Sequence, residues 1–255
     1  MDLFDGFFDE VKEYLGELNR RRLVRTSVAN LTSLWPRDTD DHVIFESDTA
    51  IELGHPRTES SAFMLLTESA GQVIDNRITV IGPDLPEIKE KKVPFGKITL
   101  LRCHGLTEDN ISERYSELDM VRIKLRMRDY MLRATPQNMK EWSRVGKKGL
   151  KAGLSFQVLG SELIRDYTSY EYVDAVEVIF VTSSAEDVRR LKPTGEKVAR
   201  VIDALNKMFD DLEPDCTSCD FNDICNEIDD LRKMHNKMAK KTPGEGAADQ
   251  TNIKK

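Results

Sequence analysis

The stretch that most constrains the fold of this chain is Val173–Thr182, which reads VDAVEVIFVT. It is a nearly continuous apolar run, rich in β-branched residues and bounded by polar ones. A run of this kind is typical of a strand that is buried on both faces. We therefore predict a central strand whose sheet is covered by helices on both sides.

Shorter strand candidates lie close together upstream of this run and are separated by turns that contain Gly and Pro. They are Val43–Glu46, Ala50–Leu53, Ala62–Leu66, Arg77–Ile81 and Lys97–Arg102. Trp142–Val145 is a further short β-like segment. Such a density of strands favours a mixed or antiparallel sheet over a regular alternation of strands and helices.

Helical periodicity predicts the elements that flank the sheet. The expected helices cover about residues 2–20, 108–133, 147–152, 155–167, 193–212 and 226–240. Ser155 is the expected N-cap of one of them, and Asp220 that of the helix that begins beside Cys225. The predicted fold class is mixed α/β (α+β), a mixed sheet flanked by helices, with an N-terminal helix and a C-terminal helical extension that carries cysteines.

The same patterns divide the chain into four expected parts. These are an N-terminal helical segment at 1–40, an α/β domain at 41–192, a helical cysteine-containing extension at 193–240 and a disordered tail at 241–255. The tail is small and polar, and such composition is typical of disorder. The aromatic face of the first helix could pack on the body of the protein or on a second copy in a homo-oligomer.

Charge and cysteine usage narrow the functional classes. No apolar run approaches the roughly 18 residues that a membrane span requires. The start resembles neither a signal nor a transit peptide, and four unevenly spaced cysteines do not indicate a secreted disulfide framework, so we expect a cytoplasmic protein. Residues 122–151 hold ten Lys and Arg against two acidic residues, which favours binding of an anion. A nucleic-acid partner is not expected, because the arginine cluster at 20–22 lacks interleaved aromatic residues.

Three of the four cysteines form a C-x2-C-x5-C motif, Cys216, Cys219 and Cys225. This compact spacing suits three corners of a [4Fe–4S] cluster, and the fourth ligand would come from Cys103, His235 or a partner chain. On an unbroken helix His235 would lie about 15 Å from Cys225, so Cys103 is the preferred fourth ligand. Zinc is an alternative metal, and a buried core thiol at Cys225 without any metal is another.

Four blocks of residues in chain order resemble one known family. They are IELGHP at 51–56, ITVIGPD at 78–84, WSRVGKKGLKAGLS at 142–155 and VEVIFVT at 176–182. Together they resemble the middle domain of acetyl-CoA synthase, the beta subunit of the CO dehydrogenase/acetyl-CoA synthase complex. The likeness covers roughly residues 43–190.

The resemblance implies a mixed α/β unit with a coenzyme A-binding surface that bears tryptophan and arginine. It places this surface at Trp142, Arg144 and Lys147, where the indole could stack on adenine and the cations could meet phosphates. The alternative is that Trp142 anchors the core and Arg144 belongs to a salt bridge.

The family's catalytic centre holds nickel and iron–sulfur and requires a C-x-C pair that does not occur here, so we do not expect acetyl-CoA synthesis. The leading hypothesis is an iron–sulfur-containing accessory or electron-transfer subunit in anaerobic one-carbon or acyl-CoA metabolism. Its partner would be a larger redox, CO dehydrogenase or corrinoid-type enzyme. The alternative is a CoA- or acyl-CoA-binding module with a structural metal site. A role as a metal-delivery factor is a further alternative. A complete enzyme has the least support, because no full catalytic constellation is visible in the sequence.

Overall fold

The computed structural model describes residues 3–21, 23–38, 43–134, 139–210 and 219–241. Its main sheet has five strands in the spatial order β1, β4, β9, β6, β3. Their bounds are Val24–Val28 (β1), Ser60–Thr67 (β3), Arg77–Ile81 (β4), Phe95–Cys103 (β6) and Val173–Val181 (β9). The central strand β9 pairs parallel with β4 and antiparallel with β6, so the predicted mixed sheet and its central strand are confirmed.

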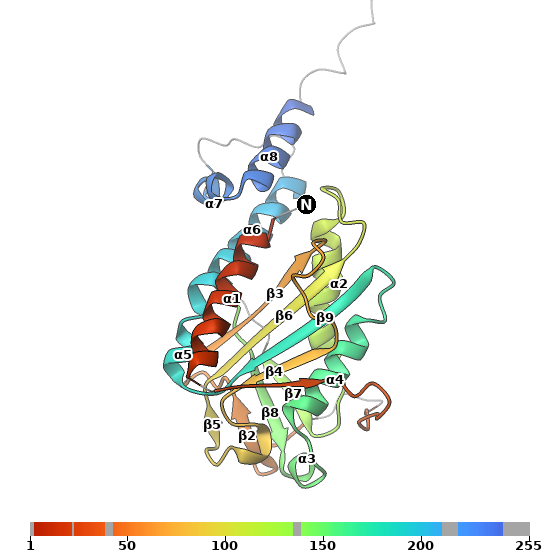
Figure 1. Cartoon of the computed structure of the whole chain (residues 1–255), viewed down its shortest axis with the longest axis vertical. Coiled ribbons are helices and arrows are strands. Elements are labelled where there is room, and N and C mark those ends of the chain that lie inside the picture. The colour runs from red at the N-terminus through yellow and green to blue at the C-terminus, as the bar shows by residue number, and fades with distance from the viewer. Residues whose placement is uncertain (1–2, 22, 39–42, 135–138, 211–218, 242–255) are drawn as a thin grey trace, which may run out of the picture.

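A second, smaller sheet has the order β5, β2, β8, β7. Its strands are Thr49–Leu53 (β2), Lys92–Val93 (β5), Tyr130–Ala134 (β7) and Trp142–Gly146 (β8). Strand β2 pairs parallel with β5, and β8 pairs antiparallel with both β2 and β7. In Figure 1 this sheet lies at the lower end of the main sheet.

Helices cover both faces of the main sheet (Figure 1). The helices are Asp5–Arg20 (α1), Ile111–Lys124 (α2), Lys147–Lys151 (α3), Phe156–Tyr167 (α4), Ala185–Arg189 (α5), Lys192–Asp210 (α6), Asn222–Glu227 (α7) and Asp229–Lys241 (α8), with a 3-10 turn at Leu85–Glu87 (η1). On the α4 face, the ring of Phe156 stacks on Phe180 of β9 with centroids 4.6 Å apart. On the opposite face, α6 packs on β3, and α1 runs beside α6. No helix among the described residues is long and apolar enough to cross a membrane.

Helix α4 begins where its sequence predicts. The Ser155 hydroxyl accepts a hydrogen bond from the Val158 amide at 3.3 Å, which satisfies one of the free N–H groups of the first turn. Gly160 lies against Ile78 so closely that a Cβ would come within 2.9 Å of that side chain. This close approach fixes the distance between the helix and β4.

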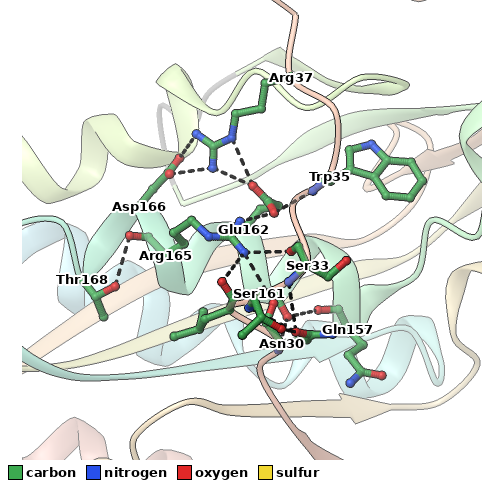
Figure 2. Close-up of polar contacts among 12 residues, drawn as sticks. Asn30, Ser33, Trp35, Arg37, Gln157, Ser161, Glu162, Arg165, Asp166 and Thr168 are labelled. Carbon is green, nitrogen blue, oxygen red and sulfur yellow. Dashed lines mark hydrogen bonds and ion pairs between the residues drawn. The ribbon is translucent and has the colours of Figure 1, made fainter.

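A polar network fastens the segment that follows β1 to α4 (Figure 2). The carboxylate of Glu162, which is 1% exposed, accepts hydrogen bonds from Arg37 at 2.7 Å and from the Trp35 amide at 3.1 Å, and it also pairs with Arg165. Arg37 bridges to Asp166 as well, at 2.7 Å. Burial alone would raise the pKa of Glu162, but the two arginines and the amide outweigh it and hold that pKa below its usual range.

The helix predicted over 108–133 is too long. Helix α2 ends at Lys124, and Asp129 adopts a left-handed conformation with φ 63°, which an α-helix does not accommodate. Residues 130–134 form β7 instead, because they pair with β8. Pairing across the sheet therefore overrides the local helical pattern.

Three smaller predictions are also corrected. Val43–Glu46 forms no strand, and Val43 and Phe45 are 53% and 66% exposed. Asp220 does not cap α7, whose N-cap position is Phe221 without a side-chain hydrogen bond. The helix expected over 226–240 is interrupted at Ile228, where the backbone is extended with φ −116° and ψ 105°. In addition β1, which the sequence reading did not predict, makes part of the 1–40 segment an edge strand of the main sheet.

Candidate functional site

The outer face of the small sheet carries a tryptophan–arginine cluster. Trp142 and Arg144 alternate along β8 with the buried residues Ser143 and Val145, so both of them lie on the outer face. The guanidinium carbons of Arg133 and Arg144 lie 5.1 Å and 5.9 Å from the centroid of the Trp142 ring. These distances are within the range of cation–π attraction. The sequence-predicted Trp142 thus lies beside two cationic groups.

Arg144 is held in place by its neighbours. Its Nε donates to the carboxylate of Glu52, the residue directly opposite on β2, at 2.8 Å, and Nη1 donates to the carbonyl of Ile44 at 3.1 Å. Glu52 is only 3% exposed, so this pair is largely shielded from water. Arg144 therefore forms a salt bridge with Glu52, which is the alternative role that the sequence suggested for it. This salt bridge does not exclude ligand binding, because a fixed guanidinium is also a preorganised one.

Lys147 has a local structural contact too. Its ammonium donates to the carbonyl of Ser47 at 2.7 Å and so fastens the loop before β2 to the start of α3. His55 contacts the Trp142 ring edge to face, with centroids 5.2 Å apart and planes inclined by 75°. The indole Nε1 of Trp142 is buried and has no hydrogen-bond acceptor among the described residues. Such an orphaned donor is uncommon in native structures.

Arg133 is the member of this cluster that the sequence reading missed. It is exposed, and its contact with Trp142 is the one interaction that the described structure gives it. Its position was hidden because the residues of β7 were predicted as helix. The ten basic residues over 122–151 were the available signal, but they did not single out Arg133.

An open pocket lies beside the segment that precedes β8. It has a volume of about 460 Å³ and is lined by residues of β3, of the segment before β8 and of α6, among them Ser61, Met139, Lys140, Lys192 and Arg200. The Ser61 hydroxyl is buried and lacks a hydrogen-bond partner among the described residues. Lys140 is exposed and stands two residues before Trp142. Two extended residues span roughly 7 Å, so the backbone of Lys140, which lines the pocket, lies within about that distance of Trp142.

The described cysteines do not assemble a complete metal site. Cys103 ends β6 and is 1% exposed. Burial, with a smaller contribution from Asp174, raises the pKa of its thiol to about 12, which disfavours the thiolate that a metal would bind. Cys219 is half-buried and Cys225 is buried, whereas Cys216 lies outside the described residues. Across residues 3–21, 23–38, 43–134, 139–210 and 219–241, no three His, Cys, Asp or Glu side chains are grouped so that they could hold a metal ion.

His235 is much nearer to Cys225 than an unbroken helix would allow. The break at Ile228 turns α8 back, and Nδ1 of His235 lies 3.9 Å from Sγ of Cys225. The preference for Cys103 over His235 assumed an unbroken helix, and the break at Ile228 removes that assumption. The signal in the sequence was weak: a β-branched residue, Ile228, that stands before Asp229 and Asp230, the acidic first residues of α8.

The fold and the tryptophan–arginine cluster together define the class of protein. It is a mixed α/β domain that carries a tryptophan–arginine surface on its small sheet. A family model described as "CO dehydrogenase/acetyl-CoA synthase complex beta subunit" matches residues 40–188, more than half of the chain, and the chain belongs to this family. The match confirms the resemblance seen in the sequence blocks. It includes Trp142, Arg144 and Lys147 and stops before Cys216.

Three curated relatives are similar over most of this chain. "Carbon monoxide dehydrogenase/acetyl-CoA synthase subunit alpha" of Moorella thermoacetica is 27% identical over 187 residues, which are 69% of this chain and 24% of that protein. "Acetyl-CoA decarbonylase/synthase complex subunit beta 1" of Methanosarcina acetivorans is 24% identical, covering 66% of this chain and 36% of the relative. The corresponding subunit beta of Archaeoglobus fulgidus is 24% identical, with coverages of 69% and 34%. The chain thus spans between a quarter and little more than a third of their lengths.

Proposed function

We propose that this chain is a binding module for coenzyme A or an acyl-CoA. The observation that carries the proposal is the pair of guanidinium groups beside Trp142 on an outer sheet face. An indole offers a stacking surface for adenine, and guanidinium groups bind phosphate oxygens through paired, charge-assisted hydrogen bonds. The ligand class matches the printed names of the relatives, which refer to acetyl-CoA chemistry.

The cluster residues take different roles in this proposal. Arg144, fixed by Glu52, orients the Trp142 ring and offers a preorganised positive charge. Arg133 is exposed and free to move from the ring to a phosphate group. The neighbouring pocket would take the extended arm of the ligand, with Lys140 and the unpaired Ser61 hydroxyl as polar contacts.

Titration calorimetry with CoA tests the proposal on the wild type and on Arg133→Ala. Loss of one charge-assisted contact costs about 1.5–3 kcal/mol, so we expect the dissociation constant to rise roughly 10- to 150-fold. Arg133 is preferred over Arg144 as the test position because removal of Arg144 would take from the buried Glu52 its nearest cation, at 2.8 Å, and leave it only the more distant Lys92, at 3.9 Å, and His55.

The matched control is Arg20→Ala, which removes an exposed arginine at the end of α1. This variant should bind CoA as the wild type does. Absence of binding by the wild type, or equal weakening by both substitutions, would refute the module.

The iron–sulfur accessory subunit stays a second candidate because three of four cysteines are gathered in one short motif. It predicts a brown protein with iron and acid-labile sulfide in equal amounts, whereas the binding module requires neither. In both cases we propose that the chain docks on a larger enzyme subunit, since the relatives are named as subunits of complexes. Co-elution with purified subunits of such a complex in anaerobic gel filtration would test this partner, and separate elution would argue against it.

A further inference from the structure

His55 stands beside the tryptophan–arginine cluster, in the turn that follows β2. Its ring meets that of Trp142 edge to face, with centroids 5.2 Å apart and planes inclined by 75°. Aromatic rings favour this arrangement at centroid separations of about 4.5–7 Å, because the positive rim of one ring then lies against the negative face of the other. The His55 side chain is only 13% exposed. It therefore helps to fix the orientation of the indole.

Two contacts hold the imidazole of His55 in one neutral form. Its Nδ1 accepts a hydrogen bond from the backbone amide of Arg57 at 3.0 Å, so the proton of the neutral ring is on Nε2. That Nε2 lies 3.6 Å from one oxygen of the Glu52 carboxylate. The other oxygen of the same carboxylate lies 2.8 Å from Nε of Arg144. Glu52 thus links His55 to Arg144, and both of these residues contact Trp142.

The charged groups that face the imidazole come from three strands and from the turn itself. They are Glu52 of β2, Lys92 of β5, Arg144 of β8 and Arg57 of the turn. Removal from water is the largest cause, and together with the three cations it outweighs Glu52 and holds the pKa of His55 below its usual value of 6.5. The imidazole is therefore neutral at pH 7 and becomes charged in mild acid.

Protonation removes the acceptor that holds the ring in place. With a proton on Nδ1, the imidazolium would direct an N–H group at the N–H of Arg57, so this hydrogen bond is lost and the ring must turn. Attraction between the imidazolium and Glu52 acts on the Nε2 side and does not restore the bond at Nδ1. The contact with Trp142 depends on the present orientation of the imidazole, so the indole loses one of the groups that fix it.

We propose that His55 is a positioning residue for Trp142: the neutral imidazole holds the indole in the orientation that stacks on a ligand, and protonation releases the indole, so that the surface loses its ligand in acid. The effect on the ligand rests on the proposed binding of CoA, whereas the effect on the indole does not. His55 acts through the Trp142 ring and makes no contact with the ligand itself.

Two variants separate the ring of His55 from its titration. His55→Phe keeps an aromatic ring beside the indole but has no proton to gain. His55→Asn keeps a side-chain oxygen that can accept from the amide two residues on, as Asn does in turns, but it has no ring. In full-length protein labelled with 5-fluorotryptophan, the fluorine resonance of Trp142 should shift in one transition below pH 6.5 in the wild type. It should show no such transition in either variant, and Trp35→Phe identifies which of the two tryptophan resonances belongs to Trp142.

Titration calorimetry with CoA over the same pH range tests the effect on the ligand. Each pH unit below the transition lowers the neutral fraction of His55 about tenfold. The dissociation constant of the wild type should therefore rise by up to about tenfold per pH unit relative to that of His55→Phe. A phosphate monoester itself titrates near pH 6, but this affects both proteins equally and cancels in the comparison. His55→Asn should bind CoA more weakly than His55→Phe at every pH.

His104→Asn is the matched control, because His104 is a 62% exposed histidine that follows β6 and pairs with Asp174. It should keep the wild-type transition of the Trp142 resonance. A Trp142 resonance that does not shift in the wild type, or that shifts equally in His55→Phe, would overturn the proposal. Equal acid dependence of CoA binding in the wild type and His55→Phe would overturn it as well. A wild type that binds no CoA but shows the expected transition would refute the proposed function and support the role of His55 in holding the indole.

Discussion

A buried ion pair between Lys97 and Glu141 joins the two sheets, and breaking it gives the sharpest test of how they are held together. Lys97 of β6 is 4% exposed, and Glu141, which directly precedes β8, is 1% exposed. The ammonium of Lys97 pairs with one carboxylate oxygen, while Tyr130 donates to the other at 3.2 Å. Burial raises the pKa of Glu141, but the charges of Lys97 and Arg122 outweigh it and leave that pKa below its usual range.

We expect Lys97→Met to be strongly destabilising, because it leaves the Glu141 carboxylate buried without its cation. Removal of one partner of a buried pair costs about 3–5 kcal/mol. For a chain of this size each kcal/mol corresponds to about 2–4 °C in Tm, so the loss should be roughly 6–20 °C. The double variant Lys97→Met/Glu141→Gln should recover much of the loss, since it buries no unpaired charge and keeps an acceptor for Tyr130.

Urea unfolding followed by circular dichroism measures these free energies, with unchanged m-values as the sign of an intact two-state transition. Lys89→Met, which removes an exposed lysine with no described contact, is the matched control and should change stability by less than about 0.5 kcal/mol. A Lys97→Met protein as stable as that control, or a double variant no better than the single one, would refute the reasoning.

The pH dependence has a defined sign. Because the folded-state pKa of Glu141 is depressed, its contribution to stability is fully present above the pKa of the unfolded chain and is lost as the pH falls through the folded-state value. The wild type should therefore lose stability more steeply in acid than Glu141→Gln does. Parallel pH profiles of the two proteins would contradict this assignment.

Three further predictions concern other parts of the fold. Glu162→Gln weakens the charge-assisted bonds of Arg37 in the network of Figure 2. We therefore expect the free energy of unfolding to fall by about 1–3 kcal/mol and the amides of residues 30–37 to exchange hydrogen faster. Unchanged exchange in these residues would contradict the prediction. Cys103, whose buried thiol has a pKa raised to about 12, should resist alkylation in the folded protein while half-buried Cys219 reacts, and mass spectrometry of the labelled peptides decides this. Gly82→Ala should destabilise the folded protein by more than about 1 kcal/mol, because φ is 99° at this residue and a Cβ would approach the Ser183 amide nitrogen to 2.4 Å. Thermal unfolding measures the change, and a Tm equal to that of the wild type would refute the prediction.

The sequence by itself determined the elements whose local pattern and tertiary surroundings agree. Val173–Val181 is β-branched and buried, so its pattern predicts both a strand and a central position, and it occupies the middle of the main sheet. The apolar face of α1 and the Ser155 cap of α4 were also predictable, because amphipathic spacing and capping act over a few residues.

Tertiary structure alone decided the points at which a residue's role depends on a distant partner. Residues 130–134 have a helical pattern, yet they form β7 because β8 offers an edge for pairing, and this places Arg133 over Trp142. The break at Ile228 likewise brings His235 to Cys225 across ten residues. The sequence could name the tryptophan surface and the cysteine motif. Which side chains lie beside them depended on long-range packing, whose free energy exceeds the small differences in local propensity.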